Sequence, residues 1–317
     1  MKVLVTPRSI NPEICGHALG LLRSFTKEII FNTEERPLTE DELIPLLKDC
    51  DGCVAGLDHF TRKVIQNVSG LKVISRYGVG VDSVDLEAAR EKGVAVCNTP
   101  GANSNAVADL TFGLLLCLAR NLLFLDKNLR EDKWLRLTGI ELYGKTLGII
   151  GLDAVGKAVA KRASGFSMKI LAYDPFINSE YAKANGIINA SFDDVTREAD
   201  FLSLHLPLTK ETRNIISGET MKAMKKGAII INTARGGLID EKAAYELLKS
   251  GHLGGLGLDA FEMEPPPAQE LFTLDNVVLT PHTGAYTAEA MANMADMAVQ
   301  NLIDVLSGRN CPNIVNL

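Results

Sequence analysis

The sequence lacks the features of membrane-spanning, secreted and nucleic-acid-binding proteins. No apolar run reaches the roughly 18–20 residues that a membrane-spanning helix needs. The amino-terminal MKVLVTP has the pattern of a first strand and lacks the long apolar core of a signal peptide. The formal net charge of −6 argues against nucleic acid or an anionic membrane as the main partner. We therefore expect a cytoplasmic globular protein with neither of these partners.

Cysteine is also scarce, and the six cysteines are scattered along the chain. Such scatter is typical of reduced thiols in the cytoplasm and not of a disulfide framework. Cys50 and Cys53 have the spacing of a redox or metal-binding pair, but no second pair of ligands accompanies them. We interpret them as packing positions beside a strand, and we expect no metal site.

The sequence does contain an alternation of apolar runs and helical patterns over its whole length. At 317 residues, with 46% hydrophobic and 23% charged residues, the chain is expected to form about two globular domains. The alternation predicts an α/β fold with two doubly wound parallel sheets. In the amino-terminal part, strands are predicted at 2–6, 53–55, 73–75 and 94–97, and helices at 14–25, 39–47, 61–68 and 85–92.

The alternation continues to the end of the chain. A long helical pattern from Ser104 towards Leu129 is expected to cross from the first domain to the second, and a final amphipathic helix at 288–306 is expected to return. We therefore predict one domain from 1–98 plus 288–317 and another from 99–287, with a cleft between them. Further strands are predicted at 147–150, 170–173, 200–204, 228–232, 255–260 and 277–280, and helices at 179–185, 217–225 and 240–250.

The stretch from Thr146 to Asp174 has the form of a dinucleotide-binding unit. An apolar run at 147–150 meets Gly151, a helical pattern follows, and a second apolar run ends in Asp174. N–H groups at the helix N-terminus are expected to hold a pyrophosphate, and Asp174 is expected to accept hydrogen bonds from ribose hydroxyls. The middle glycine of the G-x-G-x-x-G pattern is replaced by Asp153.

Polar residues follow the ends of three later predicted strands. These residues are Arg235, then Asp259 with Glu264, and then His282. Because ligands bind at the carboxyl ends of strands in open α/β sheets, these side chains are predicted to form one site. A guanidinium can grip the carboxylate and the carbonyl oxygen of a 2-oxo acid. An imidazolium beside a carboxylate can protonate that oxygen while hydride arrives from a nicotinamide.

At these residues the chain resembles the D-2-hydroxyacid dehydrogenase family, and within it the phosphoglycerate-dehydrogenase-like branch. The resemblance implies a flavodoxin-like substrate-binding domain, a Rossmann NAD-binding domain, NAD as cofactor, a 2-hydroxy or 2-oxo acid as substrate, and a homodimer or homotetramer. It covers nearly the whole chain and is carried by R-Y-G-V-G-V-D at 76–82, N-T-P-G-A-N at 98–103, H-L-P-L-T at 205–209, N-T-A-R-G-G at 232–237, G-L-D-A-F at 257–261 and T-P-H at 280–282.

The resemblance also implies roles for single residues. Catalysis would fall to Arg235, Glu264 and His282, and the substrate would bind Arg76, Val79, Gly80 and Arg235. The cofactor would be lined by Gly151, Asp153, Ala154, Val155, Gly156, Asp174, His205, Pro207, Thr212, Thr233, Ala234, Asp259, His282 and Gly284. Asp174 implies NAD and not NADP, because a 2′-phosphate would meet a like charge and no guanidinium follows it.

Asp153 departs from the fingerprint. A carboxylate within about 4–5 Å of a phosphate costs about 3–4 kcal/mol at an effective dielectric near 20. We expect cofactor affinity to fall about a hundredfold or more, unless the loop moves or Asp153 is protonated. Three interpretations stay open: an introduced or accidental change in an active enzyme, a natural variant that binds NAD weakly, or a protein that no longer turns over. The presence of the three catalytic residues favours the first two.

The choice of substrate also stays open. Arg76 matches an arginine that in phosphoglycerate dehydrogenases reaches the substrate phosphate, but Ala55 occupies the second expected basic position. From the end at Leu317 we expect a protein without the regulatory extension that serine-feedback enzymes carry. Both 3-phosphoglycerate and another small 2-hydroxy acid are therefore compatible with the sequence. Tyr286 replaces a small polar residue and either narrows the pocket or packs. The alternative function is a dinucleotide-sensing or partner-binding protein, like the corepressor relatives of the family.

Overall fold

The structure, a computed structural model, describes residues 1–34 and 36–316. The chain forms two compact units. Unit 1 comprises Met1–Asn103 with Tyr286–Leu317, and unit 2 comprises Ser104–Ala285. The chain therefore passes twice between the units, a few residues away from the two boundaries expected from the sequence. Leu317, the last residue of the predicted first domain, lies outside the described residues.

In its described residues, unit 1 contains a five-stranded sheet in the order β2-β1-β3-β4-β5, and every pairing is parallel. This is the flavodoxin-like strand order of a doubly wound fold. Its strands are β1 (Lys2–Val5), β2 (Glu28–Phe31), β3 (Gly52–Ala55), β4 (Val73–Arg76) and β5 (Ala95–Cys97). Its helices are α1 (Pro12–Phe25), α2 (Glu40–Leu47), α3 (Arg62–Asn67), α4 (Leu86–Lys92) and α12 (Ala288–Leu306).

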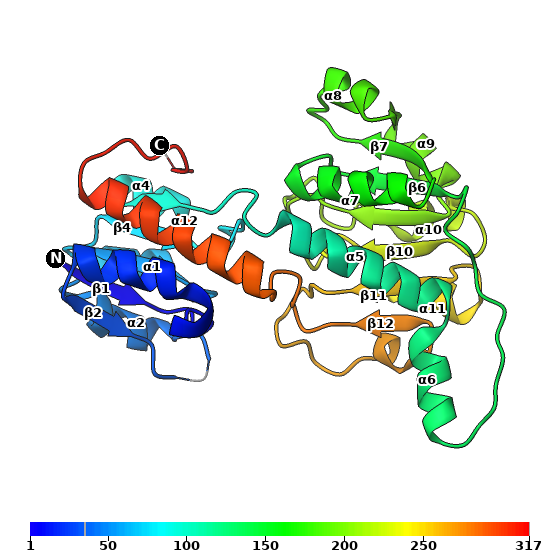
Figure 1. The fold of residues 1–317 in the computed structure, drawn as a ribbon, viewed down its shortest axis with the longest axis horizontal. Coiled ribbons are helices and arrows are strands. Elements are labelled where there is room, and N and C mark those ends of the chain that lie inside the picture. The colour runs from blue at the N-terminus through cyan, green and yellow to red at the C-terminus, as the bar shows by residue number, and fades with distance from the viewer. Residues whose placement is uncertain (35, 317) are drawn as a thin grey trace. The chain divides into compact units, whose positions relative to one another are not determined.

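Helices cover both faces of the unit 1 sheet. Successive side chains of a strand point to opposite faces, so each strand contributes to both cores. Val3 and Val5 pack with α1 and α12, whereas Leu4 packs with α2, α3 and α4. Figure 1 shows the final helix, α12, lying beside α1 within this unit. The start of α2 is a capping box, in which Thr39 N–H donates to Glu42 Oε2 at 2.8 Å.

In its described residues, unit 2 contains a seven-stranded parallel sheet in the order β12-β11-β10-β9-β6-β7-β8. The order reverses around β6, as in the dinucleotide-binding doubly wound fold. The strands are β6 (Thr146–Ile150), β7 (Lys169–Tyr173), β8 (Ile187–Asn189), β9 (Phe201–Leu204), β10 (Ile229–Asn232), β11 (Gly255–Leu258) and β12 (Val277–Leu279). The helices are α5 (Ser104–Ala119), α6 (Leu122–Arg130), α7 (Ala154–Gly165), α8 (Ser179–Ala184), α9 (Phe192–Glu198), α10 (Gly218–Ala223), α11 (Glu241–Lys249) and the 3₁₀ helix η1 (Glu270–Thr273).

The unit 2 sheet also has a core on each face. Phe112 and Leu115 of α5 pack with α7 against one face, and α9, α10 and α11 cover the other. Figure 1 shows α5 and α7 running side by side along the sheet. The fold class expected from the sequence, two doubly wound parallel-sheet domains, is confirmed.

Two details of the predicted elements were wrong. The helix expected from Ser104 to Leu129 is broken into α5 and α6, which bend by 62° where Asn121 adopts a left-handed φ of 52°. Because unit 2 begins at Ser104, α5 belongs wholly to that unit. The sequence also missed β2, β8, α9 and η1, which are short, and β2 and β8 lie at sheet edges where alternation is weak.

Within the described part of the chain, no single helix is long and apolar enough to cross a membrane. The bent pair α5 and α6 passes that test by length and composition only. The apolar side chains of α5 are largely buried in the unit 2 core.

Candidate active site

The turn between β6 and α7 is so tight that its two glycines have no room for side chains. Gly151 has φ +96°, and a Cβ there would lie 2.5 Å from the carbonyl oxygen of His205. A Cβ on Gly156 would lie 2.2 Å from the carbonyl oxygen of Gly151. The turn therefore requires glycine at both positions, and it brings the start of α7 against the end of β6.

Asp153 has a role at this turn that the sequence did not suggest. It is the N-cap of α7, and its Oδ1 accepts hydrogen bonds from the N–H groups of Val155 and Gly156, both at 2.9 Å. An N-cap carboxylate satisfies donors that have no partner within the helix. The replacement of glycine by Asp153 therefore stabilises the helix at the point where the fingerprint places a phosphate.

Asp174 follows β7 and is fixed to the same turn. Its Oδ2 accepts a hydrogen bond from Leu152 N–H at 2.7 Å, and its Oδ1 accepts one from Phe176 N–H at 2.7 Å. The carboxylate thus lies beside the first residues after β6, where the fingerprint predicts contact with a ribose.

The loop after β9 holds its histidine inside the protein. His205 is buried, and its Nε2 lies 2.8 Å from Ser203 Oγ. Burial lowers the pKa of His205 to about 3, so the imidazole is neutral and unsuited to proton transfer near pH 7. Further along, Thr212 Oγ1 donates to the carbonyl oxygen of Pro207 at 2.7 Å, which closes the loop on itself.

The loop after β10 carries Arg235. Asn232 fixes this loop, because its Nδ2 donates to Arg235 O at 2.8 Å and its Oδ1 accepts from Ala234 N–H at 3.1 Å. Thr233 Oγ1 lies 3.0 Å from Thr111 Oγ1 of α5. A Cβ on Gly236 would lie 1.9 Å from the backbone of Phe261, so this loop presses directly on the loop after β11.

Asp259, at the end of β11, organises the loop that carries His282. It is 1% exposed, and its Oδ1 accepts from Thr280 Oγ1 at 2.6 Å and from Thr283 N–H at 2.7 Å. Its Oδ2 accepts from Gly284 N–H at 2.8 Å. These bonds hold His282 at a φ of 51°, a conformation that residues other than glycine rarely adopt.

His282 and Glu264 form an ion pair at the edge of unit 2. Nδ1 of His282 lies 2.7 Å from Oε2 and 2.9 Å from Oε1 of Glu264, while Phe261 N–H donates to Oε1 at 3.0 Å. With Nδ1 directed at the carboxylate, Nε2 is the ring nitrogen left for a substrate. The imidazole is 39% exposed, so it is accessible.

The electrostatics of this pair favour a charged imidazole. The hydrogen bond from His282 to Glu264 raises the pKa of His282 and outweighs the opposing effect of burial. Burial acts to raise the pKa of Glu264, but the hydrogen bonds from His282 and Phe261 N–H together lower it. Arg235 is close enough to act on both groups, and its charge works to lower the pKa of each. The three predicted catalytic residues are therefore neighbours.

All the cofactor-lining residues predicted from the sequence lie in unit 2, at or after the carboxyl ends of its strands. Because the strands are parallel, these ends share one edge of the sheet. The sequence missed three positioning residues at this edge, which stand inside the quoted motifs or beside the predicted residues: Asn232, Thr280 and Thr283.

Three of the four residues predicted to bind substrate, Arg76, Val79 and Gly80, lie in unit 1, at and after the end of β4, whereas Arg235 lies in unit 2. Arg76 is 5% exposed, and its guanidinium donates to the carbonyl oxygens of Ala55 at 2.8 Å and Gly80 at 3.1 Å. Asn98 Nδ2 donates to the carbonyl oxygen of Val79 at 2.8 Å. Arg76 thus joins the end of β3 to the loop after β4. Tyr286, also in unit 1, is 63% exposed.

Residues 112–284 match the model of the D-isomer specific 2-hydroxyacid dehydrogenase, NAD binding domain. The chain belongs to the D-isomer specific 2-hydroxyacid dehydrogenase family. It is 48% identical over 284 residues to D-3-phosphoglycerate dehydrogenase of Methanocaldococcus jannaschii, covering 88% of this chain and 54% of that one, so it spans about half of that relative's length. It is 40% identical over 291 residues to glyoxylate reductase of Korarchaeum cryptofilum, covering 89% and 88% of the two chains.

A solved structure gives the same family fold. The TT0316 protein from Thermus thermophilus superposes with a TM-score of 0.88 at 39% identity, over 99% of this chain and 100% of that chain. Membership of the D-2-hydroxyacid dehydrogenase family makes this chain an oxidoreductase that uses a nicotinamide dinucleotide. The tight β6–α7 turn and the placement of Asp174 fit such a cofactor, with Asp153 as the exception.

Within the described residues, no group of three or more His, Cys, Asp or Glu side chains is placed to hold a metal ion. Cys50 and Cys53 are both buried in the core of unit 1, in line with their interpretation as packing residues.

Proposed function

We propose that this family member interconverts a D-2-hydroxy acid and its 2-oxo acid, with His282, Glu264 and Arg235 as the residues that act on the substrate. The observation that carries this proposal is the contact between His282 Nδ1 and the Glu264 carboxylate, 2.7 Å at its shortest. The pair supplies a charged, oriented imidazole with one free nitrogen, which is the requirement for a general acid.

In the direction of reduction, His282 Nε2–H donates its proton to the carbonyl oxygen of the 2-oxo acid. Glu264 keeps the ring in one orientation and stabilises its charged form. Arg235 binds the carboxylate and the carbonyl oxygen of the substrate. The bound nicotinamide supplies the hydride. In the direction of oxidation, the neutral His282 takes the hydroxyl proton back.

We infer that the cofactor is NAD in preference to NADP. Asp174 lies where the ribose of the adenosine is expected, and a 2′-phosphate there would meet its negative charge. Pro175 and Phe176, which follow it, offer no compensating cation. NADH should therefore support a much higher kcat/KM than NADPH, and Asp174→Ala should narrow the difference.

We propose a small 2-oxo acid without a phosphate, such as glyoxylate or hydroxypyruvate, as the substrate. Two donors of the Arg76 guanidinium bind backbone carbonyl oxygens of unit 1, and Ala55 stands at the second expected basic position. The specific alternative is phosphohydroxypyruvate, which is supported by the similarity to a D-3-phosphoglycerate dehydrogenase.

The test is the loss of NADH absorbance with glyoxylate, hydroxypyruvate and phosphohydroxypyruvate. His282→Ala should reduce kcat by at least about a hundredfold, in line with the loss of a general acid. His252→Ala is the matched control, because the ring of His252 contacts Met221 O at 3.0 Å outside the site. If no 2-oxo acid is reduced even at saturating NADH, a dinucleotide-sensing protein becomes the better interpretation.

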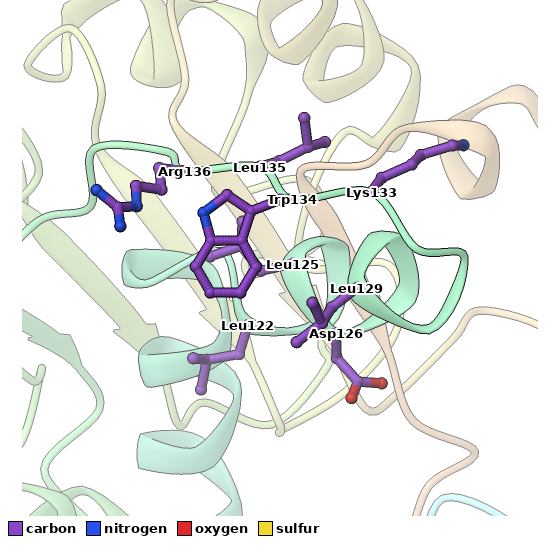
Figure 2. Close-up of a pocket in the computed structure, with 8 residues that line it drawn as sticks. All are labelled: Leu122, Leu125, Asp126, Leu129, Lys133, Trp134, Leu135 and Arg136. Atoms are coloured by element: carbon purple, nitrogen blue, oxygen red, sulfur yellow. The ribbon is translucent and has the colours of Figure 1, made fainter.

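We also propose that the chain assembles as a homodimer or homotetramer, with the arm formed by residues 122–143 as a contact surface. Leu129, Trp134 and Tyr143 of this arm are 56%, 75% and 73% exposed, and an exposed apolar patch of this kind marks an interaction site. Figure 2 shows Trp134 lying over Leu125, with Leu122 and Leu129 nearby in the same hollow.

Light scattering after gel filtration would test the assembly. Leu129→Lys with Trp134→Ser should shift the mass towards one chain. Phe176→Ser is the control, because Phe176 is 94% exposed outside the arm. An unchanged mass in the double variant would exclude the arm as the contact surface.

A further inference from the structure

The N-cap of α7 and the cofactor need the same backbone groups. The first N–H groups of a helix have no partner within the helix, and in a dinucleotide-binding turn they face the pyrophosphate. In this chain a single oxygen, Asp153 Oδ1, already bonds two of them, Val155 N–H and Gly156 N–H. The turn thus keeps both required glycines, Gly151 and Gly156, while its donors are occupied.

We propose that the Asp153 carboxylate is a built-in competitor of the cofactor pyrophosphate, which must be displaced from the α7 N-terminus before the dinucleotide can bind tightly. This inference rests on the proposed function, since it assumes that the cofactor lies at this turn. It assigns Asp153 to the control of cofactor affinity, and it makes the capping of α7 and the binding of the pyrophosphate mutually exclusive.

The charges around the turn support the competition. Asp174 Oδ2 is bonded to Leu152 N–H at 2.7 Å, so a second carboxylate lies against the residue that precedes Asp153. The Lys157 ammonium, one turn into α7, lies over the Tyr181 ring at 4.7 Å from its centroid. A pyrophosphate would therefore enter a turn that already carries two carboxylates, and like charges repel each other.

The competition predicts which parts of the cofactor Asp153 affects. Only ligands that bring a phosphate to the turn should meet it, whereas adenosine alone should not. Isothermal titration with NADH, ADP and adenosine separates these contributions. Asp153→Asn retains an N-cap residue, but its neutral amide oxygen is a weaker acceptor than a carboxylate and does not repel a phosphate. A pyrophosphate should therefore displace it more easily, so NADH and ADP should bind at least about tenfold more tightly while the affinity for adenosine stays unchanged.

In Asp153→Gly, the stability of the free protein and its affinity for NADH should change in opposite directions. Because glycine is itself tolerated at an N-cap, loss of the carboxylate cap should lower the melting temperature of the free protein by only about one degree. The same variant should bind NADH more tightly than the unmodified chain. A residue that only stabilised the helix would lower the melting temperature without tightening NADH.

The matched control is Asp240→Asn. Asp240 is the N-cap of α11, where its Oδ1 accepts from Ala243 N–H at 3.0 Å, so this variant loses the same charge at another helix of unit 2. It should leave NADH affinity unchanged. Equal NADH affinity in Asp153→Asn and the unmodified chain, or an equal gain for adenosine, would overturn the inference and leave the proposed function standing. Binding of NADH to none of the folded variants would overturn both.

Discussion

Nδ1 of His282 lies within 3 Å of both carboxylate oxygens of Glu264, at 2.7 and 2.9 Å. The two residues come from different loops, one after β11 and one after β12, so the pair exists only when both loops are in place. Its effect on proton transfer follows from the directions of the two pKa values, which move apart: His282 upwards and Glu264 downwards.

Glu264→Gln should move the pH profile of reduction to lower pH. Reduction needs the protonated imidazole, so its rate falls as the pH rises through the His282 pKa. Loss of the carboxylate removes the main cause that raises this pKa, so the alkaline limb of kcat/KM should fall earlier. In oxidation, which needs the neutral ring, the acidic limb should also move down. A profile identical to that of the unmodified enzyme would contradict this role.

The same variant should lose stability in a defined pH range. A His pKa that is raised in the folded state contributes stability that is fully present below the unfolded value of about 6.5 and is lost as the pH rises through the folded value. Urea unfolding at pH 6 and pH 9 measures this. Glu264→Gln should be less stable than the unmodified chain at pH 6, and the difference should shrink at pH 9.

Asp259→Ala should damage both stability and turnover. The variant leaves the donors of Thr280, Thr283 and Gly284 without their buried acceptor, and each such group costs about 1–3 kcal/mol. We expect urea unfolding to show a loss of about 2 kcal/mol or more and kcat to fall as His282 moves. Asp275→Ala, at an exposed aspartate in the turn between η1 and β12, is the control that should change neither.

Arg76→Gln distinguishes a positioning role from phosphate binding. If the guanidinium mainly joins Ala55 O to Gly80 O, KM should rise about equally for hydroxypyruvate and phosphohydroxypyruvate. A rise confined to phosphohydroxypyruvate would instead assign Arg76 to the substrate phosphate and would contradict the preference for a small substrate. Steady-state kinetics on both substrates gives the answer.

Gly236→Ala should separate the loops that carry Arg235 and Glu264. Its Cβ would lie 1.9 Å from the backbone carbonyl carbon of Phe261, which cannot yield as a flexible side chain would. We expect a loss of stability of about 1–3 kcal/mol and a marked fall in kcat. Gly165→Ala, at the end of α7 with no atom within 4 Å of the added Cβ, should leave the melting temperature and kcat nearly unchanged.

Much of the fold could be predicted from the sequence because buried parallel strands are continuous apolar runs. Runs such as Ile229–Asn232 and Leu147–Ile150 show where the strands lie. The polar residues that follow such a run are then expected at the carboxyl edge of the sheet. The neighbourhood of Arg235, Glu264 and His282 followed from the same pattern. Edge strands such as Ile187–Asn189 escaped, since only one of their residues is buried.

The hydrogen-bond partners of the polar side chains could not be predicted from the sequence. Asp153 and Asp259 are both single letters in a motif, yet one caps a helix and the other holds a neighbouring loop. Arg76 was expected to face the substrate phosphate, and its guanidinium bonds backbone carbonyl oxygens. Such choices depend on distances between strands that are far apart in sequence.

The loop of residues 280–284, which carries His282, is attached to Asp259 at the end of the neighbouring strand β11. The catalytic imidazole takes its position from β11, through Asp259, and not only from the strand that precedes it. The hydrogen bonds of Asp259 therefore tie the proton donor to β11 directly, without passing through the intervening chain, 265–276. In this architecture, a buried carboxylate at the end of one strand fixes the acid–base residue that follows the next strand.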